Sequence, residues 1–184
     1  YQMSYHMTLA EKIAISLFKE MVPDGKIGHV VAMQVIYPSS SAPQDILAAN
    51  NAQDEVQWSF LDLSIKGEYS YHFETYLKER DIYPEINKED KHYLIENSPD
   101  FIGVNYYASC TVRAKYEEDD DSKMPPFYQS DQFYVVKNEK IEPTEWMHFG
   151  IDPDGLYIGL RNLYDRYQLP MIITENGMAY TDVV

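Results

Sequence analysis

The sequence predicts an α/β fold built on parallel strands. Three short apolar segments are typical of strands that are covered on both faces, and they occupy residues 30–36, 101–107 and 171–174. Segments with the helical spacing of apolar residues alternate with them, and strands that alternate with helices form parallel sheets. The strand starts lie about 70 residues apart, roughly double a minimal βαβ unit, so each connection is expected to carry extra loop.

The first element is predicted to be a helix over residues 3–21. Polar residues such as Glu11, Lys12 and Lys19 separate apolar residues that recur every three or four positions. These apolar residues are Met3, Met7, Ala10, Ile13, Ala14, Leu17, Phe18 and Met21. A Pro-Asp-Gly sequence at residues 23–25 ends the helix. We expect the apolar face to be buried.

Two helices are expected between the first and second strands. The first carries an apolar stripe in which His72 packs on its own helix: Tyr69, His72, Phe73, Tyr76 and Leu77. The second covers residues 87–97 and is stopped by Ser98-Pro99. Residues 38–57 are expected to form a loop.

A further helix is expected before the third strand, starting at Asp152-Pro153. Asp can cap free backbone N–H groups, and Pro at the first helical position loses no needed donor. The buried side of this helix would be Leu156, Leu160, Leu163, Tyr164 and Tyr167. Residues 115–145 are expected to form a second long loop.

Composition restricts the class of protein. The chain has 184 residues, 15 Lys and Arg against 30 Asp and Glu, a net charge of −15, and 45% hydrophobic residues. It is therefore too apolar for a disordered acidic chain, and it lacks the basic stripe that holds nucleic acid. No apolar run approaches the roughly 20 residues of a membrane span, and no signal-peptide layout is seen. Cys110 is the single cysteine, so no internal disulfide can form, and we expect a cytoplasmic protein with no nucleic-acid or membrane partner.

Glu175 is the strongest candidate for chemistry. It follows the predicted strand 171–174 directly and precedes Asn176 and Gly177, which permit a sharp exit. Barrel enzymes place catalytic groups at this end of their parallel strands, where a rigid base meets open loops. The alternative is a solvated glutamate at a strand end.

Asn105, Tyr106 and Tyr107 follow the second strand in the same way. Asn105 could donate to a sugar hydroxyl or to a carboxylate, and one phenol could hold a neighbouring carboxylate. The alternative makes both tyrosines packing residues, and we favour that role for Tyr106. With 17 tyrosines, the chain also suits a carbohydrate site, although aromatic residues dominate protein cores generally.

Other candidate clusters are assigned structural roles. The acidic run at residues 117–121 lacks the ligand spacing of a calcium loop, so we expect a solvated loop. The five histidines have no metal-ligand spacing, so no metal site and no cofactor are expected. Cys110 is expected to be a small, buried or half-buried side chain.

Two motifs together resemble glycoside hydrolase family 1, the retaining β-glycosidases on a (β/α)8 barrel. They are Asp-Phe-Ile-Gly-Val-Asn-Tyr-Tyr at residues 100–107 and Thr-Glu-Asn-Gly at residues 174–177, in the family's order. Residues 25–43 are similar to the 6-phospho-β-glucosidase branch of that family. The stretch from Trp146 to Pro170 is similar to the family's approach to its seventh strand. The resemblance covers residues 1–184 as one domain and implies strands five, six and seven of a TIM barrel, an incomplete barrel with three of eight strands.

The resemblance assigns roles to three residues. It implies that Glu175 is the nucleophile, that Tyr107 positions it through a hydrogen bond, and that Asn105 is a substrate-binding neighbour. The family's acid/base glutamate lies in an Asn-Glu-Pro motif that this chain does not contain. In this branch the phosphate is held by a serine and a lysine with a nearby tyrosine, in the loop after strand eight, which this chain also lacks.

The expected function is therefore a segment of a retaining 6-phospho-β-glucosidase. Its substrate would be a phosphorylated β-glucoside or disaccharide, split into glucose 6-phosphate and an aglycone or sugar. Alternatives are a non-catalytic carbohydrate-binding or structural fragment, or a general β-glucosidase. The isolated chain is expected to be inactive, because retaining hydrolysis needs two carboxyl groups. Its open sheet edges are expected to promote self-association.

Overall fold

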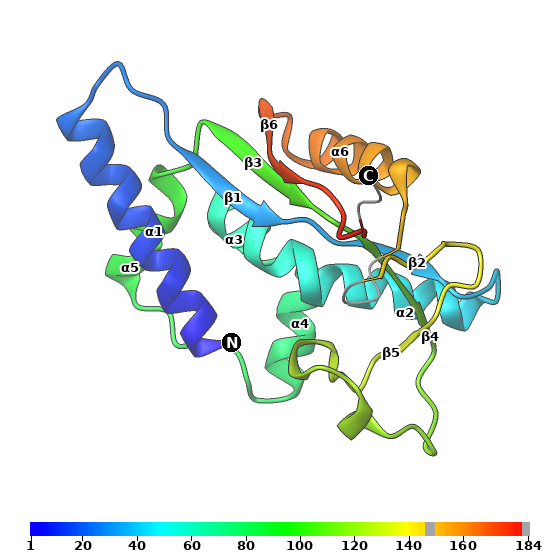
Figure 1. Cartoon of the computed structure of the whole chain (residues 1–184). Helices are drawn as coiled ribbons and strands as arrows, with labels where there is room; N and C mark the ends of the chain where they lie inside the picture. Colours follow the sequence, from blue (N-terminus) through cyan, green and yellow to red (C-terminus); the bar gives the residue numbers. More distant parts are fainter. Residues whose placement is uncertain (146–149, 182–184) are drawn as a thin grey trace.

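The computed structural model describes residues 1–145 and 150–181, so Trp146 and His148 lie outside the described residues. Three parallel strands form the main sheet (Figure 1). β1 (Gly28–Ala32), β3 (Phe101–Tyr106) and β6 (Met171–Asn176) lie in the order β1-β3-β6. Both pairings are parallel, so the predicted α/β fold on three parallel strands is confirmed.

After β1, and again after β3, the chain enters a second, smaller sheet. β2 (Val35–Pro38) pairs in parallel with β4 (Ser109–Arg113), and β5 (Tyr134–Val136) runs antiparallel to β4. Neither β4 nor β5 is predicted from the sequence.

The unbroken strand predicted over residues 30–36 is wrong, because the chain leaves the ladder at Gln34. Glutamine side chains replace the neighbouring strand there. The Gln34 N–H donates to Gln57 Oε1 at 2.7 Å, and the Gln34 C=O accepts from Gln53 Nε2 at 3.1 Å.

The connection from β2 to β3 is helical where the sequence predicts a loop over residues 38–57. α2 (Pro43–Gln53), a π-helical turn (Asp54–Trp58) and α3 (Ser59–Lys66) form one run. Pro43 occupies the first helical position, where its missing N–H costs nothing. Three alanines then give the run a buried side: Ala48, Ala49 and Ala52.

Two short helices complete this connection, α4 (Tyr71–Glu79) and α5 (Lys88–Glu96). The predicted stripe is confirmed for the buried residues Tyr69, Phe73, Tyr76 and Leu77. His72 does not pack on its own helix. It is exposed, and its Nε2 lies 3.1 Å from Asn51 Oδ1.

α6 (Pro153–Tyr167) precedes β6 and begins as predicted. The Asp152 carboxylate accepts a hydrogen bond from the Gly155 N–H at 2.9 Å, and the Tyr37 hydroxyl also donates to it at 3.0 Å. Gly155 is required by close approach, since a Cβ there would lie 2.1 Å from the Tyr106 hydroxyl. Hydrogen bonds to Asp152 thus tie the start of α6 to β2 through Tyr37 and to β3 through Tyr106.

The core lies on one side of the main sheet. Side chains from β1, β2 and β3 pack against Leu61 of α3 and Leu163 of α6, and they are Val31, Met33, Val35, Ile102, Val104 and Tyr106. On the other side Val30 and Ile172 are exposed. The sheet is therefore covered by helices on one face only.

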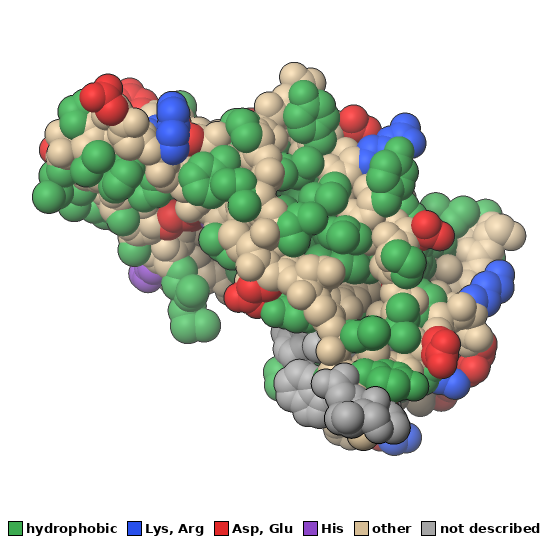
Figure 2. Space-filling model, turned by 45° about the horizontal axis from the view of Figure 1, so that its top comes forward, with side chains coloured by type: hydrophobic (Ala, Val, Ile, Leu, Met, Phe, Trp, Pro, Cys, Tyr) green, Lys and Arg blue, Asp and Glu red, His purple; other side chains and the backbone are tan. Residues whose placement is uncertain are grey.

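α1 (Gln2–Met21) is a helix as predicted, but the expected buried face is wrong. Met7 is 68% exposed and Leu17 is 52% exposed, and only Phe18 of the apolar stripe is half-buried. The helix buries Tyr5, Thr8, Lys12 and Ile15 instead. Figure 2 shows the hydrophobic side chains gathered along the lobe that α1 forms and over the centre of the molecule.

Residues 115–145 are mostly irregular, as expected, but the acidic run is not uniformly solvated. Glu117 and Glu118 are exposed, whereas both carboxylate oxygens of Asp119 accept from the Arg113 guanidinium, at 2.5 and 2.7 Å. This pair lowers the pKa of Asp119 to about 2. Cys110 is buried, as expected. Within the described part of the chain, no helix combines the length and apolar character needed to cross a membrane.

Candidate active site

The predicted site residues lie at the ends of β3 and β6, which are neighbouring strands of the main sheet (Figure 1). Alternation along β3 turns Val104 and Tyr106 into the core, which leaves Asn105 and the following Tyr107 on the opposite face. Gly103 lies on this same face, where a larger residue would not fit, because a Cβ there would lie 2.8 Å from Val30 Cγ2. Asn105, Tyr107 and Glu175 are therefore brought together.

A shift in register sets the direction of Glu175. Val104 pairs with Ile173 and Asn105 pairs with Glu175, so Thr174 is an extra residue in β6. In a regular strand adjacent side chains point to opposite faces, whereas a bulge can place two of them on one face. Thr174 and Glu175 accordingly both contact side chains of the uncovered face.

The Tyr107 hydroxyl donates to Glu175 Oε2 at 2.5 Å. This hydrogen bond to a carboxylate raises the pKa of Tyr107 above its usual value. Tyr107 is 41% exposed and Glu175 is exposed, so the pair stands open to a ligand. The contact holds Oε2. Because Glu175 lies on a strand, Oε1 keeps a fixed direction as well.

Thr174 fixes the neighbouring amide. Its Oγ1 donates to Asn105 Oδ1 at 2.5 Å, so the oxygen of the amide is occupied and its NH2 group is left to donate. The sequence does not single out Thr174, since threonine is an ordinary strand residue and no local pattern marks the bulge.

Tyr106 belongs to the covered face. It is 3% exposed, and its hydroxyl donates to the Asp152 backbone carbonyl at 3.1 Å. Burial raises the pKa of Tyr106. The Asn176 amide donates to the Tyr106 carbonyl at 2.8 Å, which ties the end of β6 to β3. The predicted packing role of Tyr106 is confirmed.

Carboxylate, phenol and amide groups make up this site. Over residues 1–145 and 150–181 the structure contains no group of three or more His, Cys, Asp or Glu side chains that could hold a metal ion. The arrangement provides a positioned carboxylate nucleophile or base beside hydrogen-bond donors, which suits acid–base or covalent chemistry on a polyhydroxyl ligand.

A sequence model described as Glycosyl hydrolase family 1 matches residues 1–184. The chain belongs to this family. Among curated relatives, the aryl-phospho-beta-D-glucosidase BglH of Bacillus subtilis is 35% identical over 184 residues, which are all of this chain and 38% of BglH. The 6-phospho-beta-glucosidase GmuD of the same organism is 36% identical over 181 residues, which cover 97% of this chain and 38% of GmuD.

Solved structures of similar proteins have the same fold. The Thermotoga maritima family 1 b-glucosidase matches 98% of this chain and 37% of its own, with a TM-score of 0.77 and 29% identity. The virulence factor SghA of Agrobacterium tumefaciens matches 98% of this chain and 38% of its own, with a TM-score of 0.81 and 25% identity. The open sheet is thus a segment of the family's TIM barrel with three of its eight strands, as predicted, and the chain spans 37 to 38% of the length of these four relatives.

Proposed function

We propose that this chain is the segment of a retaining 6-phospho-β-glucosidase that carries the catalytic nucleophile, Glu175. The observation that carries the proposal is the contact between the Glu175 carboxylate and the Tyr107 hydroxyl at 2.5 Å, on the uncovered face beside Asn105. The substrate class is supported by relatives that are named phospho-β-glucosidases and match nearly all of the chain.

In this mechanism Glu175 attacks the anomeric carbon while a second carboxyl group protonates the leaving glycosidic oxygen. The resulting glycosyl ester is then opened by water, whose proton the second carboxylate takes, and Glu175 is released with the anomeric configuration retained. Tyr107 holds Oε2 so that the carboxylate keeps its orientation through both steps. The amide NH2 of Asn105, set by Thr174, donates to a sugar hydroxyl.

The second carboxyl group must lie about 5 to 5.5 Å from Glu175 in a retaining enzyme. The family's Asn-Glu-Pro motif, which would supply it, does not occur in these 184 residues. We therefore assign the activity to the complete enzyme and expect the isolated chain to be inactive. We also assign the phosphate-binding residues to the loop after strand eight, outside this chain.

Substrate preference tests this proposal. We expect the complete enzyme to show a kcat/KM for an aryl 6-phospho-β-glucoside at least on the order of a hundredfold above that for the unphosphorylated glucoside, because buried phosphate-binding groups would be left unpaired by the latter. Glu175→Gln serves as the control and should remove the activity. Equal values, or a preference for the plain glucoside, would instead assign the protein to the general β-glucosidases.

A further inference from the structure

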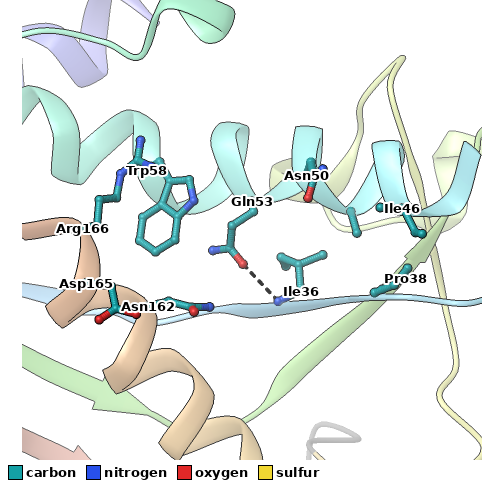
Figure 3. A pocket seen from close by; sticks show the side chains of 10 residues that line it. Ile36, Pro38, Ile46, Asn50, Gln53, Trp58, Asn162, Asp165 and Arg166 are labelled. Atoms are coloured by element: carbon teal, nitrogen blue, oxygen red, sulfur yellow. Dashed lines mark hydrogen bonds between the residues drawn. The ribbon is translucent and has the colours of Figure 1, made fainter. Parts of the chain in front are cut away.

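A second hollow lies on the helix-covered side of the sheet, away from Glu175. It has a volume of about 500 Å³ and is bounded by β2, by the run from α2 through the π-helical turn, and by the end of α6 (Figure 3). Ligand-binding clefts commonly have volumes of about 300 to 1,000 Å³. β2 and α6 share one core through Val35 and Leu163, Trp58 of the π-helical turn packs against it, and α2 is anchored in a neighbouring cluster through its alanines, so the walls of the hollow are rigid.

Trp58 is the aromatic wall of this hollow. The π-helical turn carries it, and π-turns within α-helices often occur at functional sites. In Figure 3 the indole reaches from the helix toward β2, between Arg166 and Gln53. The Arg166 guanidinium lies 4.9 Å from the ring centroid, and the Tyr167 ring meets it edge-on at 6.2 Å. These contacts hold the half-buried indole in place as a flat apolar surface.

The amide groups that line the hollow differ in whether their hydrogen bonds are already made within the protein. Gln53 is already occupied, because its amide accepts from the Ile36 N–H and donates to the Gln34 carbonyl, so it forms a fixed part of the wall. Asn50 on α2 and Asn162 on α6 line opposite sides of the hollow, with Gln53 between them in Figure 3, and both are exposed. Each amide offers a donor and an acceptor to a ligand.

Among the described residues, the one cation that lines the hollow, Arg166, is already paired. The Arg166 guanidinium makes two hydrogen bonds with the carboxylate of Asp62, which is 1% exposed, so its charge is already compensated. Lys66 pairs with the same Asp62 carboxylate at 3.2 Å, and Asp165, which also lines the hollow, lies 3.7 Å from the Arg161 guanidinium, so these charges are paired as well. No unpaired cation among the lining residues that the structure describes is therefore offered to a phosphate or carboxylate, whereas hydroxyl groups could bind the amides and Asp165.

We propose that this hollow binds a neutral saccharide. An apolar face of the sugar ring packs on Trp58, and its hydroxyls bind the amides of Asn50 and Asn162 and the carboxylate of Asp165. The site lies on the opposite face of the sheet from the proposed nucleophile, and it takes an unphosphorylated sugar. It does not depend on the function proposed for Glu175.

The test is 19F NMR on the complete polypeptide that carries this chain, labelled with 5-fluorotryptophan and bearing Glu175→Gln to prevent hydrolysis. The Trp58 resonance is assigned by its loss in Trp58→Phe. Cellobiose is the probe, and it should shift this resonance saturably with a dissociation constant of millimolar order. Glucose 6-phosphate should not shift it.

Two variants locate the binding site. Asn50→Ala with Asn162→Ala should weaken cellobiose binding at least tenfold without affecting the fold, since both side chains are exposed. Gln44→Ala is the matched control, because Gln44 is an exposed amide of α2 outside the hollow, and it should leave binding unchanged. The proposal is overturned by the absence of a saturable shift, by equal affinity in the double variant, or by a shift that disappears when an excess of an aryl 6-phospho-β-glucoside, which the Glu175→Gln protein does not hydrolyse, occupies the active site.

Discussion

Asn105 on β3, Tyr107 directly after β3 and the bulge at Thr174 set the Glu175 carboxylate. Tyr107 binds Oε2 directly, whereas Asn105 is held by Thr174 at the adjoining position. Because Asn105, Thr174 and Glu175 lie on strands and Tyr107 sits in the two-residue link between β3 and β4, the geometry of the site does not depend on a long loop. Each side chain can therefore be tested separately.

The two adjacent phenols should respond differently to removal of the hydroxyl group. Tyr107→Phe in the complete enzyme should keep the fold and lower kcat on the order of ten- to a hundredfold, because one hydrogen bond to the nucleophile is lost. Tyr106→Phe should affect turnover less, since its hydroxyl binds the Asp152 carbonyl in the core. Steady-state kinetics of both variants checks this. An equal loss at both positions would show that the wrong phenol has been assigned to Glu175.

The site residues could be predicted from sequence only in part. Polar side chains directly after apolar strands mark Asn105, Tyr107 and Glu175, and the parallel fold explains why they meet. The role of Thr174 could not be predicted, because it depends on one extra residue in the pairing of β6 with β3. Strand register is a property of two segments together, and the sequence of one segment does not contain it.

The helices show a similar limit. The period of α1 predicts its bounds closely, but it does not reveal which face other elements will cover. The face that packs here includes Lys12, which is fully buried and whose pKa burial lowers to about 8. Residues 38–57 were a harder case, because serines 39–41 indicate a loop while the alanines that follow continue into α2.

The connection after β4 should be sensitive to acid. In the folded chain Arg113 lowers the pKa of Asp119 to about 2, so between about pH 4 and pH 2 the unfolded state binds more protons than the folded state. Stability is therefore expected to fall as the pH falls through this window, and Asp119→Asn should reduce the fall. Denaturant unfolding at several pH values measures it.

Glu117→Gln is the matched control for this experiment, since Glu117 is an exposed carboxylate of the same run. It should leave the pH dependence of unfolding nearly as it is in the unsubstituted chain. If Asp119→Asn and Glu117→Gln change the loss of stability at low pH equally, the bidentate contact with Arg113 has no special role.

At the scale of the whole molecule, the chain combines a well-packed core with an uncovered face. Exposed apolar residues lie on α1 and along β6, and they include Met3, Met7, Leu17, Met21, Ile172 and Ile173. The relatives are more than twice as long as this chain. We propose that the remaining strands and helices of a complete barrel cover these surfaces.

The 184-residue chain alone should therefore self-associate and should not hydrolyse β-glucosides. Unpaired strand edges and exposed apolar surface both favour association. Light scattering after size-exclusion chromatography should give a mass above 21.5 kDa. Met7→Glu with Leu17→Glu should shift the chain toward the monomer, whereas Glu20→Gln, an exposed change on the same helix, should not. A monomer at high concentration, or turnover that depends on Glu175, would contradict this prediction.

Covalent trapping tests the central claim most directly. The complete enzyme is treated with a 2-deoxy-2-fluoro 6-phospho-β-glucoside that carries a good leaving group, so that the glycosyl ester forms faster than it is hydrolysed. Digestion and mass spectrometry should then find one modified peptide containing residues 171–177, with the sugar on Glu175, and Glu175→Gln should abolish the labelling. A label on another residue, or hydrolysis with no covalent intermediate and with inverted anomeric configuration, would contradict the assignment of Glu175 as the nucleophile.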